Sequence, residues 1–115
     1  MSHDESKIAA ARRSIFEAAQ DMLAGRLSYI EGARKICPAR FAWGLDEWDP
    51  DLVPFVGIFS ETDALPVGDE RSLWQKSALE ALAPEIARME AWARKFGEPH
   101  SKSLVERFSC GEIEL

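Results

Sequence analysis

The sequence predicts an all-α fold, a single compact bundle of about five helices with an irregular acidic loop in the middle. Apolar residues recur every three or four positions along most of the chain, as in helices that bury one face. Glycines, prolines and capping residues divide this pattern into segments of ordinary helical length. The chain has 115 residues, of which 46% are hydrophobic, so it can form one domain with its own core but not two.

The first two helices are predicted from apolar stripes and clear end signals. Residues 5–24 carry apolar side chains at helical spacing, and Gly25 follows as a terminator. Ser28 and Glu31 form a capping-box pattern, in which the serine oxygen accepts from a backbone N–H and the glutamate reaches back to the cap residue. The second helix is expected to end before Pro38, because the proline ring clashes with the preceding turn.

The middle of the chain is less regular. Residues 38–51 are aromatic and acidic without a clear period, so a structured loop is expected there. Asp49 followed by Pro50 is a good helix start, and apolar residues recur at helical spacing from Leu52 to Phe59. The valines and aromatic residues of this run also suit a strand, so a buried helix is favoured and a strand stays an alternative.

The last third of the chain is predicted to hold three helical pieces. A short one starts at Asp69 or Ser72, and a long one covers Pro84 to Phe96, with Gly97 closing it. A final helix is expected over residues 99–108. The tails, residues 1–5 and 109–115, are expected to be mobile.

Composition disfavours several functional classes. The net charge of −6 has the wrong sign for nucleic acid, whose binding depends on basic side chains. The longest apolar stretch, residues 52–59, is far shorter than the roughly 20 residues of a membrane-spanning helix. Residues 1–11 are polar and charged, unlike a secretory signal, so the cytoplasm is the expected location. Cys37 and Cys110 lie far apart, so neither a zinc site nor a redox pair is predicted, and no cofactor is expected.

Negative charge is concentrated in one segment. Between Phe41 and Glu70 there are eight acidic residues and no lysine or arginine, which gives this segment a formal charge of −8. Packing like charges together raises the free energy of the folded chain, and a basic partner would relieve that repulsion. Tryptophans flanked by charge are typical of interface anchors. A competing interpretation is that the acids cap helices and the tryptophans belong to the core.

The leading hypothesis is therefore a non-enzymatic protein, of the immunity or adaptor type, that presents an acidic surface to a basic protein partner. The residues expected to bind that partner are Trp43, Asp46, Glu47, Trp48, Asp49 and Asp51. A homodimer formed through exposed tryptophans or the long helix is a further alternative.

A small-molecule or divalent-metal site is the alternative from another class. Its residues would be Ser60, Glu61, Thr62, Asp63, Arg71 and Trp74. Carboxylates two positions apart diverge on a helix but could converge in an extended loop. A simpler interpretation is that Arg71 pairs with Glu61 or Asp63 and that Trp74 is a core residue.

The stretch from Asp49 to Trp74, with residues 30–36 and 85–97, resembles a group of small uncharacterised bacterial proteins. The specific part is an S-E-T-D-x-L-P-x-G segment made by Ser60, Glu61, Thr62, Asp63, Leu65, Pro66 and Gly68. This resemblance implies a bacterial, cytoplasmic origin and carries no activity, cofactor or catalytic residue. The likeness to immunity proteins that block secreted toxins is one of size and charge only.

Overall fold

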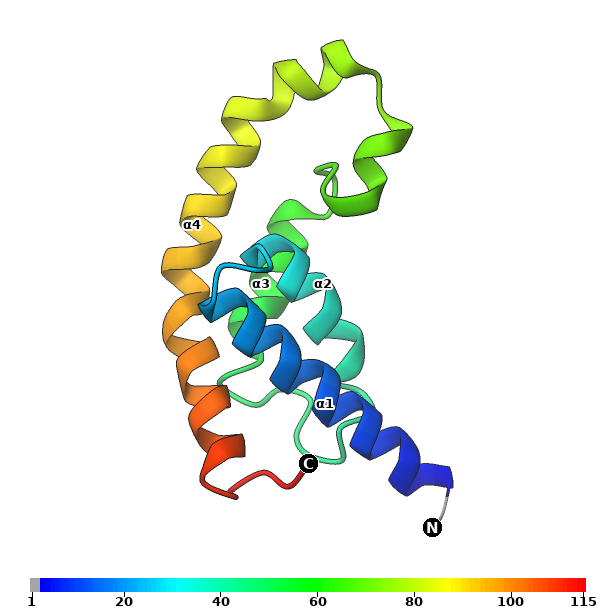
Figure 1. Cartoon of the computed structure of the whole chain (residues 1–115), viewed down its shortest axis with the longest axis vertical. Coiled ribbons are helices and arrows are strands. Elements are labelled where there is room, and N and C mark those ends of the chain that lie inside the picture. Colours follow the sequence, from blue (N-terminus) through cyan, green and yellow to red (C-terminus); the bar gives the residue numbers. More distant parts are fainter. Residues whose placement is uncertain (1–2) are drawn as a thin grey trace.

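The computed structural model describes residues 3–115, without the side chain of His3. These residues form four α-helices, one 3₁₀ helix and no strand, which confirms the all-α prediction. The elements are α1 (His3–Leu23), α2 (Tyr29–Ala39), α3 (Val53–Thr62), η1 (Gly68–Leu73) and α4 (Lys76–Ser109). Figure 1 shows α1, α2 and α3 gathered beside the C-terminal half of α4, while the first turns of α4 extend beyond them. None of the helices in the described part of the chain is long and apolar enough to cross a membrane.

The open question about residues 53–59 is resolved in favour of a helix. Pro54 lies in the first turn of α3, where a missing backbone N–H costs no helical hydrogen bond. Phe55 and Ile58 are fully buried, and they pack with Ile30 and Ile36 of α2 in the core. Burial of one face by these side chains gives the short helix its stability, since an isolated helix of this length is marginal in water.

The two helices predicted for residues 84–96 and 99–108 are a single helix. α4 runs without a break through Gly97 and Pro99, so Gly97 is not a terminator. A Cβ atom at Gly97 would lie 2.9 Å from Tyr29 Cδ2 and 3.2 Å from the side chains of Phe55 and Ile58. The glycine therefore permits close packing of α4 against α2 and α3, and this tertiary packing outweighs the local stop signals.

Three further boundaries differ from the prediction. Pro38 lies inside α2, which ends one residue later, so its missing N–H weakens only the last turn. Asp49 does not cap α3; its Oδ1 atom accepts a hydrogen bond from the Asp51 N–H, and the helix begins at Val53. The short helix expected from Asp69 or Ser72 is the 3₁₀ helix η1.

The C-terminal tail is packed, in contrast to the mobile segment expected. Ile113 is buried, and its N–H donates a hydrogen bond to the Arg107 carbonyl. The Arg12 guanidinium of α1 donates to the Glu114 carbonyl at 3.0 Å. Of the expected N-terminal tail, residues 1–2 lie outside the described residues, and residues 3–5 belong to the first turns of α1.

Candidate functional site

The acidic segment does not form one surface. The loop between α2 and α3, residues 40–52, lies beside the C-terminal tail at one end of the molecule, and η1 lies toward the other end (Figure 1). Asp46 and Glu47 therefore belong to a different region from Asp69 and Glu70. Glu70 also forms an ion pair with Arg34 at 3.2 Å. The eight carboxylates are divided by the fold, and their mutual repulsion is smaller than the sequence suggests.

Two of the predicted partner-binding carboxylates are bound inside the molecule. Arg107 of α4 holds both oxygens of Asp49, at 2.8 and 2.9 Å, and contacts Asp51 Oδ2 at 3.0 Å. The Ser103 hydroxyl donates to Asp51 Oδ2 at 2.6 Å, and His100 Nδ1 lies 3.0 Å from Asp51 Oδ1. These bonds fasten the loop to α4. Asp49 and Asp51 therefore do not belong to the surface that was expected to bind a partner.

The Asp51 network also changes ionisation. Burial pushes the pKa of Asp51 upward, but hydrogen bonds from Ser103, His100 and Arg107 outweigh it and leave the pKa below its usual value. The pKa of Arg107 is raised, chiefly by its hydrogen bonds to Asp49, with Glu112 contributing as a further partner. Both groups therefore stay charged in the folded protein at neutral pH.

The two tryptophans of the loop have opposite environments. Trp43 is fully buried, its indole N–H donates to the Asp46 carbonyl, and its own carbonyl accepts from Arg12 Nε at 2.7 Å. It is a core residue that fixes the loop and is not available to a partner. Trp48 is 55% exposed, as an interface anchor must be.

Sequence reasoning missed the residue that positions Trp48. The Arg40 guanidinium carbon lies 4.0 Å from the Phe41 ring centre and 5.1 Å from the Trp48 ring centre. Arg40 is 9% exposed, it donates to the Cys37 carbonyl, and within residues 4–115 it forms no ion pair. Two aromatic faces thus supply its electrostatic compensation. The available signal in the sequence was an arginine directly before Phe41, with Trp48 seven residues after that phenylalanine.

Three large apolar side chains project from this loop. Phe41 is 62% exposed, Leu45 is 45% exposed and Trp48 is 55% exposed. Asp46, which is exposed, and Glu47, which is half-buried, lie between the last two in the sequence. We call this set of residues the aromatic loop surface: Phe41, Leu45, Asp46, Glu47 and Trp48.

The residues of the alternative ligand site do not converge. Thr62 is fully buried and its hydroxyl donates to the Ile58 carbonyl at 2.6 Å, whereas Ser60, Glu61 and Asp63 are exposed around the end of α3. Side chains at successive helical positions point in different directions, which rules out joint action on one ligand in this conformation. The part of the chain that the structure describes contains no cluster of three or more metal-ligating residues.

Arg71 and Trp74 also differ from their expected roles. Arg71 has no ion pair with Glu61 or Asp63 among the described residues, and Trp74 is exposed instead of lying in the core. Arg34 of α2 performs the anchoring function in this region. Its Nη2 atom donates to the carbonyls of Thr62 and Leu65 at 2.7 and 2.8 Å.

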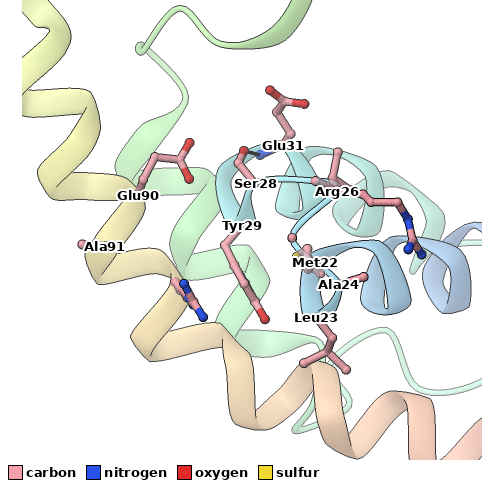
Figure 2. Close-up of a pocket in the computed structure, with 12 residues that line it drawn as sticks. Met22, Leu23, Ala24, Arg26, Ser28, Tyr29, Glu31, Glu90 and Ala91 are labelled. Carbon is pink, nitrogen blue, oxygen red and sulfur yellow. Dashed lines mark hydrogen bonds between the residues drawn. The ribbon is translucent and has the colours of Figure 1, made fainter.

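A pocket of about 620 Å³ lies between the α1–α2 turn and the middle of α4 (Figure 2). Met22 and Leu23 line it from the end of α1, Tyr29 from the start of α2, and Glu90 and Arg94 from α4. The residues come from three helices that are far apart in the sequence. No local pattern indicated this pocket.

Glu90 of α4 lies beside the N-terminus of α2. The Ser28 hydroxyl and the Ile30 backbone N–H are close enough to favour the charged form of the Glu90 carboxylate. Ser28 is the N-cap, as predicted, because its oxygen accepts from the Glu31 N–H at 3.0 Å. Burial nevertheless raises the pKa of Glu90, and the nearby Glu31 carboxylate adds to that increase against the opposing effect of Ser28, Ile30 and Arg34.

Comparisons of the chain with protein-family models, curated proteins and solved structures find no match. The resemblance to small bacterial proteins therefore stays a prediction. Function has to be argued from the two features just described, the aromatic loop surface and the pocket beside Glu90.

Proposed function

We propose that the protein is a non-enzymatic binding protein, of the immunity or adaptor type, that docks a basic protein partner on the aromatic loop surface. One observation carries this proposal: Phe41, Leu45 and Trp48 are all about half exposed or more within eight residues of a loop. Aromatic side chains at the centre of an interface supply most of its binding energy. Isolated exposed apolar residues need no explanation, but a cluster of this kind is typical of a docking site.

The loop is anchored firmly enough to present these side chains in one arrangement. Buried Trp43 holds its centre, and Arg107 holds its end through Asp49. Gly44 adopts a positive φ of 77°, and a Cβ there would meet Ile8 of α1 at 3.1 Å, so the backbone lies directly on that helix. A surface that is already ordered loses less conformational entropy on binding.

The charge around the aromatic side chains supports a basic partner. The nearby Arg40 is almost completely buried against the Phe41 and Trp48 rings, so the charges that this surface presents to solvent are those of Asp46 and Glu47. Opposite charges on a partner would steer its approach and fix its orientation, while the aromatic rings supply buried area. We therefore expect the partner to offer an apolar depression surrounded by lysine or arginine side chains.

The cysteines support the cytoplasm as the place of action. Cys37 and Cys110 are both unpaired, and the Cys110 thiol is exposed. An exposed free thiol is typical of proteins kept in a reducing compartment.

Site-directed photocrosslinking tests the proposal. A photoreactive phenylalanine analogue at Phe41 should capture a partner in a lysate of the native host, and the same analogue at Phe96, which is exposed on α4, should not. The captured protein is then purified and its binding is measured with the unmodified chain. Equal capture from both positions would contradict the proposal. So would a captured protein that, once purified, does not bind the unmodified chain.

A charge-reversal variant tests the expected chemistry of that partner. Asp46→Lys combined with Glu47→Lys should slow association at low salt and weaken its dependence on salt concentration, because steering by opposite charges is lost. The melting temperature should fall little, since neither side chain forms an ion pair among the described residues and the variant loses one exposed hydrogen bond, from the Trp48 N–H to Asp46 Oδ1. Unchanged association kinetics would show that the acidic side chains do not face the partner.

A further inference from the structure

The pocket beside Glu90 has the size of a ligand site. Its volume of about 620 Å³ falls within the roughly 300–1,000 Å³ common for small-molecule sites. Figure 2 shows the Glu90 carboxylate directed from α4 toward the start of α2, with Tyr29 and Leu23 further down the same opening. One wall is therefore polar and charged, and the other offers an aromatic ring and aliphatic carbon.

The unpaired charge in this pocket is the negative charge of the Glu90 carboxylate. Two arginines stand on its walls, but Arg26 is paired with Asp21 at 2.8 Å and Arg94 with Glu98 at 3.3 Å. Glu90 forms no ion pair with a cation in the described part of the chain. The Ser28 hydroxyl and the Ile30 N–H lie near this carboxylate, but its two oxygens offer about four lone-pair sites, so it can accept further hydrogen bonds.

The apolar wall defines the rest of the ligand. Met22 and Tyr29 are almost completely buried, and Leu23 is partly exposed beside them. Burial also raises the pKa of the Tyr29 hydroxyl, so its ring carries no charge at neutral pH. A short aliphatic chain would replace water against these side chains, and a cation beside the tyrosine ring would gain further attraction.

We propose that this pocket binds a small aliphatic amine. The ammonium group donates hydrogen bonds to the Glu90 carboxylate, with the neighbouring Glu31 carboxylate adding attraction, and the carbon chain lies along Met22, Leu23 and Tyr29. This ligand supplies the positive charge that Glu90 lacks. The pocket is lined by other residues than the aromatic loop surface, so either proposal can fail alone.

Calorimetric titration with butylamine and 1,4-diaminobutane tests this inference. Both amines should bind the unmodified chain, while butyrate and 1-butanol should not, because they lack the ammonium group. Glu90→Gln should weaken amine binding at least tenfold, since the amide keeps the side-chain shape but carries no charge. Glu85→Gln, an exposed change on the same helix outside the pocket, should leave binding unchanged.

A second variant keeps the test informative if Glu90→Gln disturbs the start of α2. Leu23→Lys places an ammonium group on the pocket wall at a partly exposed position, so it should compete with the ligand and reduce its affinity. The inference is overturned if the unmodified protein binds neither amine, if butyrate binds as well as butylamine, or if both variants bind amines as tightly as the unmodified chain.

Discussion

Arg107 binds the loop between α2 and α3 to α4 and to the C-terminal tail. It joins Asp49 and Asp51, which lie more than fifty positions earlier in the chain, and it also pairs with Glu112 of the C-terminal tail. The side chain of Arg107 is 22% exposed, so these ion pairs are partly shielded from solvent. Removing one member of a shielded pair costs more than the pair contributes, because unpaired charges remain behind.

Replacing Arg107 should therefore destabilise the fold. We expect Arg107→Met to lower the free energy of unfolding by about 2–3 kcal/mol, somewhat less than the cost of breaking a fully buried pair. Lys102→Met is the matched control, because Lys102 is exposed and, among the described residues, pairs with Glu98 alone; it should change stability by less than about 0.5 kcal/mol. Urea denaturation measures both, and equal effects would show that the Arg107 network is unimportant for stability.

Glu90 makes stability depend on pH in a defined direction. Its pKa in the folded state lies above the ordinary value of 4.5, so the folded protein binds the proton more tightly than the unfolded chain. The contribution of this group is fully present below pH 4.5 and is lost as the pH rises through the folded-state pKa. The difference in unfolding free energy between the unmodified protein and Glu90→Gln should therefore decrease with rising pH. A constant difference from pH 4 to pH 8 would contradict this assignment.

Asp51 acts in the opposite sense. Its folded-state pKa lies below the ordinary value of 3.8, so its stabilising contribution is present above that value and is lost as the pH falls through the folded-state pKa. Acid titration of the unmodified protein and Asp51→Asn, followed by circular dichroism, should show that the variant loses less stability below pH 4.

The helices differ in how far local sequence determines them. Patterns within α1 and α2, together with the Ser28 cap, predict those helices closely, because short-range hydrogen bonds and one apolar face decide them. The course of α4 was not predictable in this way. Gly97 and Pro99 are local stop signals, and close packing of Gly97 against side chains of α2 and α3 shows why the helix continues.

Two glycine substitutions test this account of packing. Gly97→Ala should destabilise the protein by about 1–3 kcal/mol, because its Cβ would meet Tyr29 at 2.9 Å. Gly57→Ala in α3 should stabilise it by about 0.5–1 kcal/mol, since the nearest atom, Phe96 Cε1, lies at an ordinary 3.7 Å and alanine favours helix. Thermal or chemical denaturation measures the change in stability of each variant and shows whether it is positive or negative. A stabilising Gly97→Ala would mean that α4 does not approach α2 this closely.

On the scale of the whole molecule, the fold separates the acidic and aromatic residues that lie close together in the sequence. The sequence located the acidic segment and its tryptophans, but long-range partners decide which of these residues reach the surface. Asp49 is bound by Arg107 and Trp43 is buried, so neither reaches the surface, whereas Trp48, which lies over Arg40, is exposed. The pocket beside Glu90 could not be foreseen for the same reason, because its walls come from separate helices.

The affinity of a purified partner for two tryptophan variants tests the proposed function most directly. Trp48 lies on the aromatic loop surface, and Trp92, 38% exposed on α4 and stacked on Phe96, is an exposed tryptophan elsewhere. We expect Trp48→Ala to raise the dissociation constant about thirtyfold or more, as for a hot-spot residue worth about 2 kcal/mol, and Trp92→Ala to leave it unchanged. Equal affinity of the Trp48→Ala variant and the unmodified protein would contradict docking on this loop.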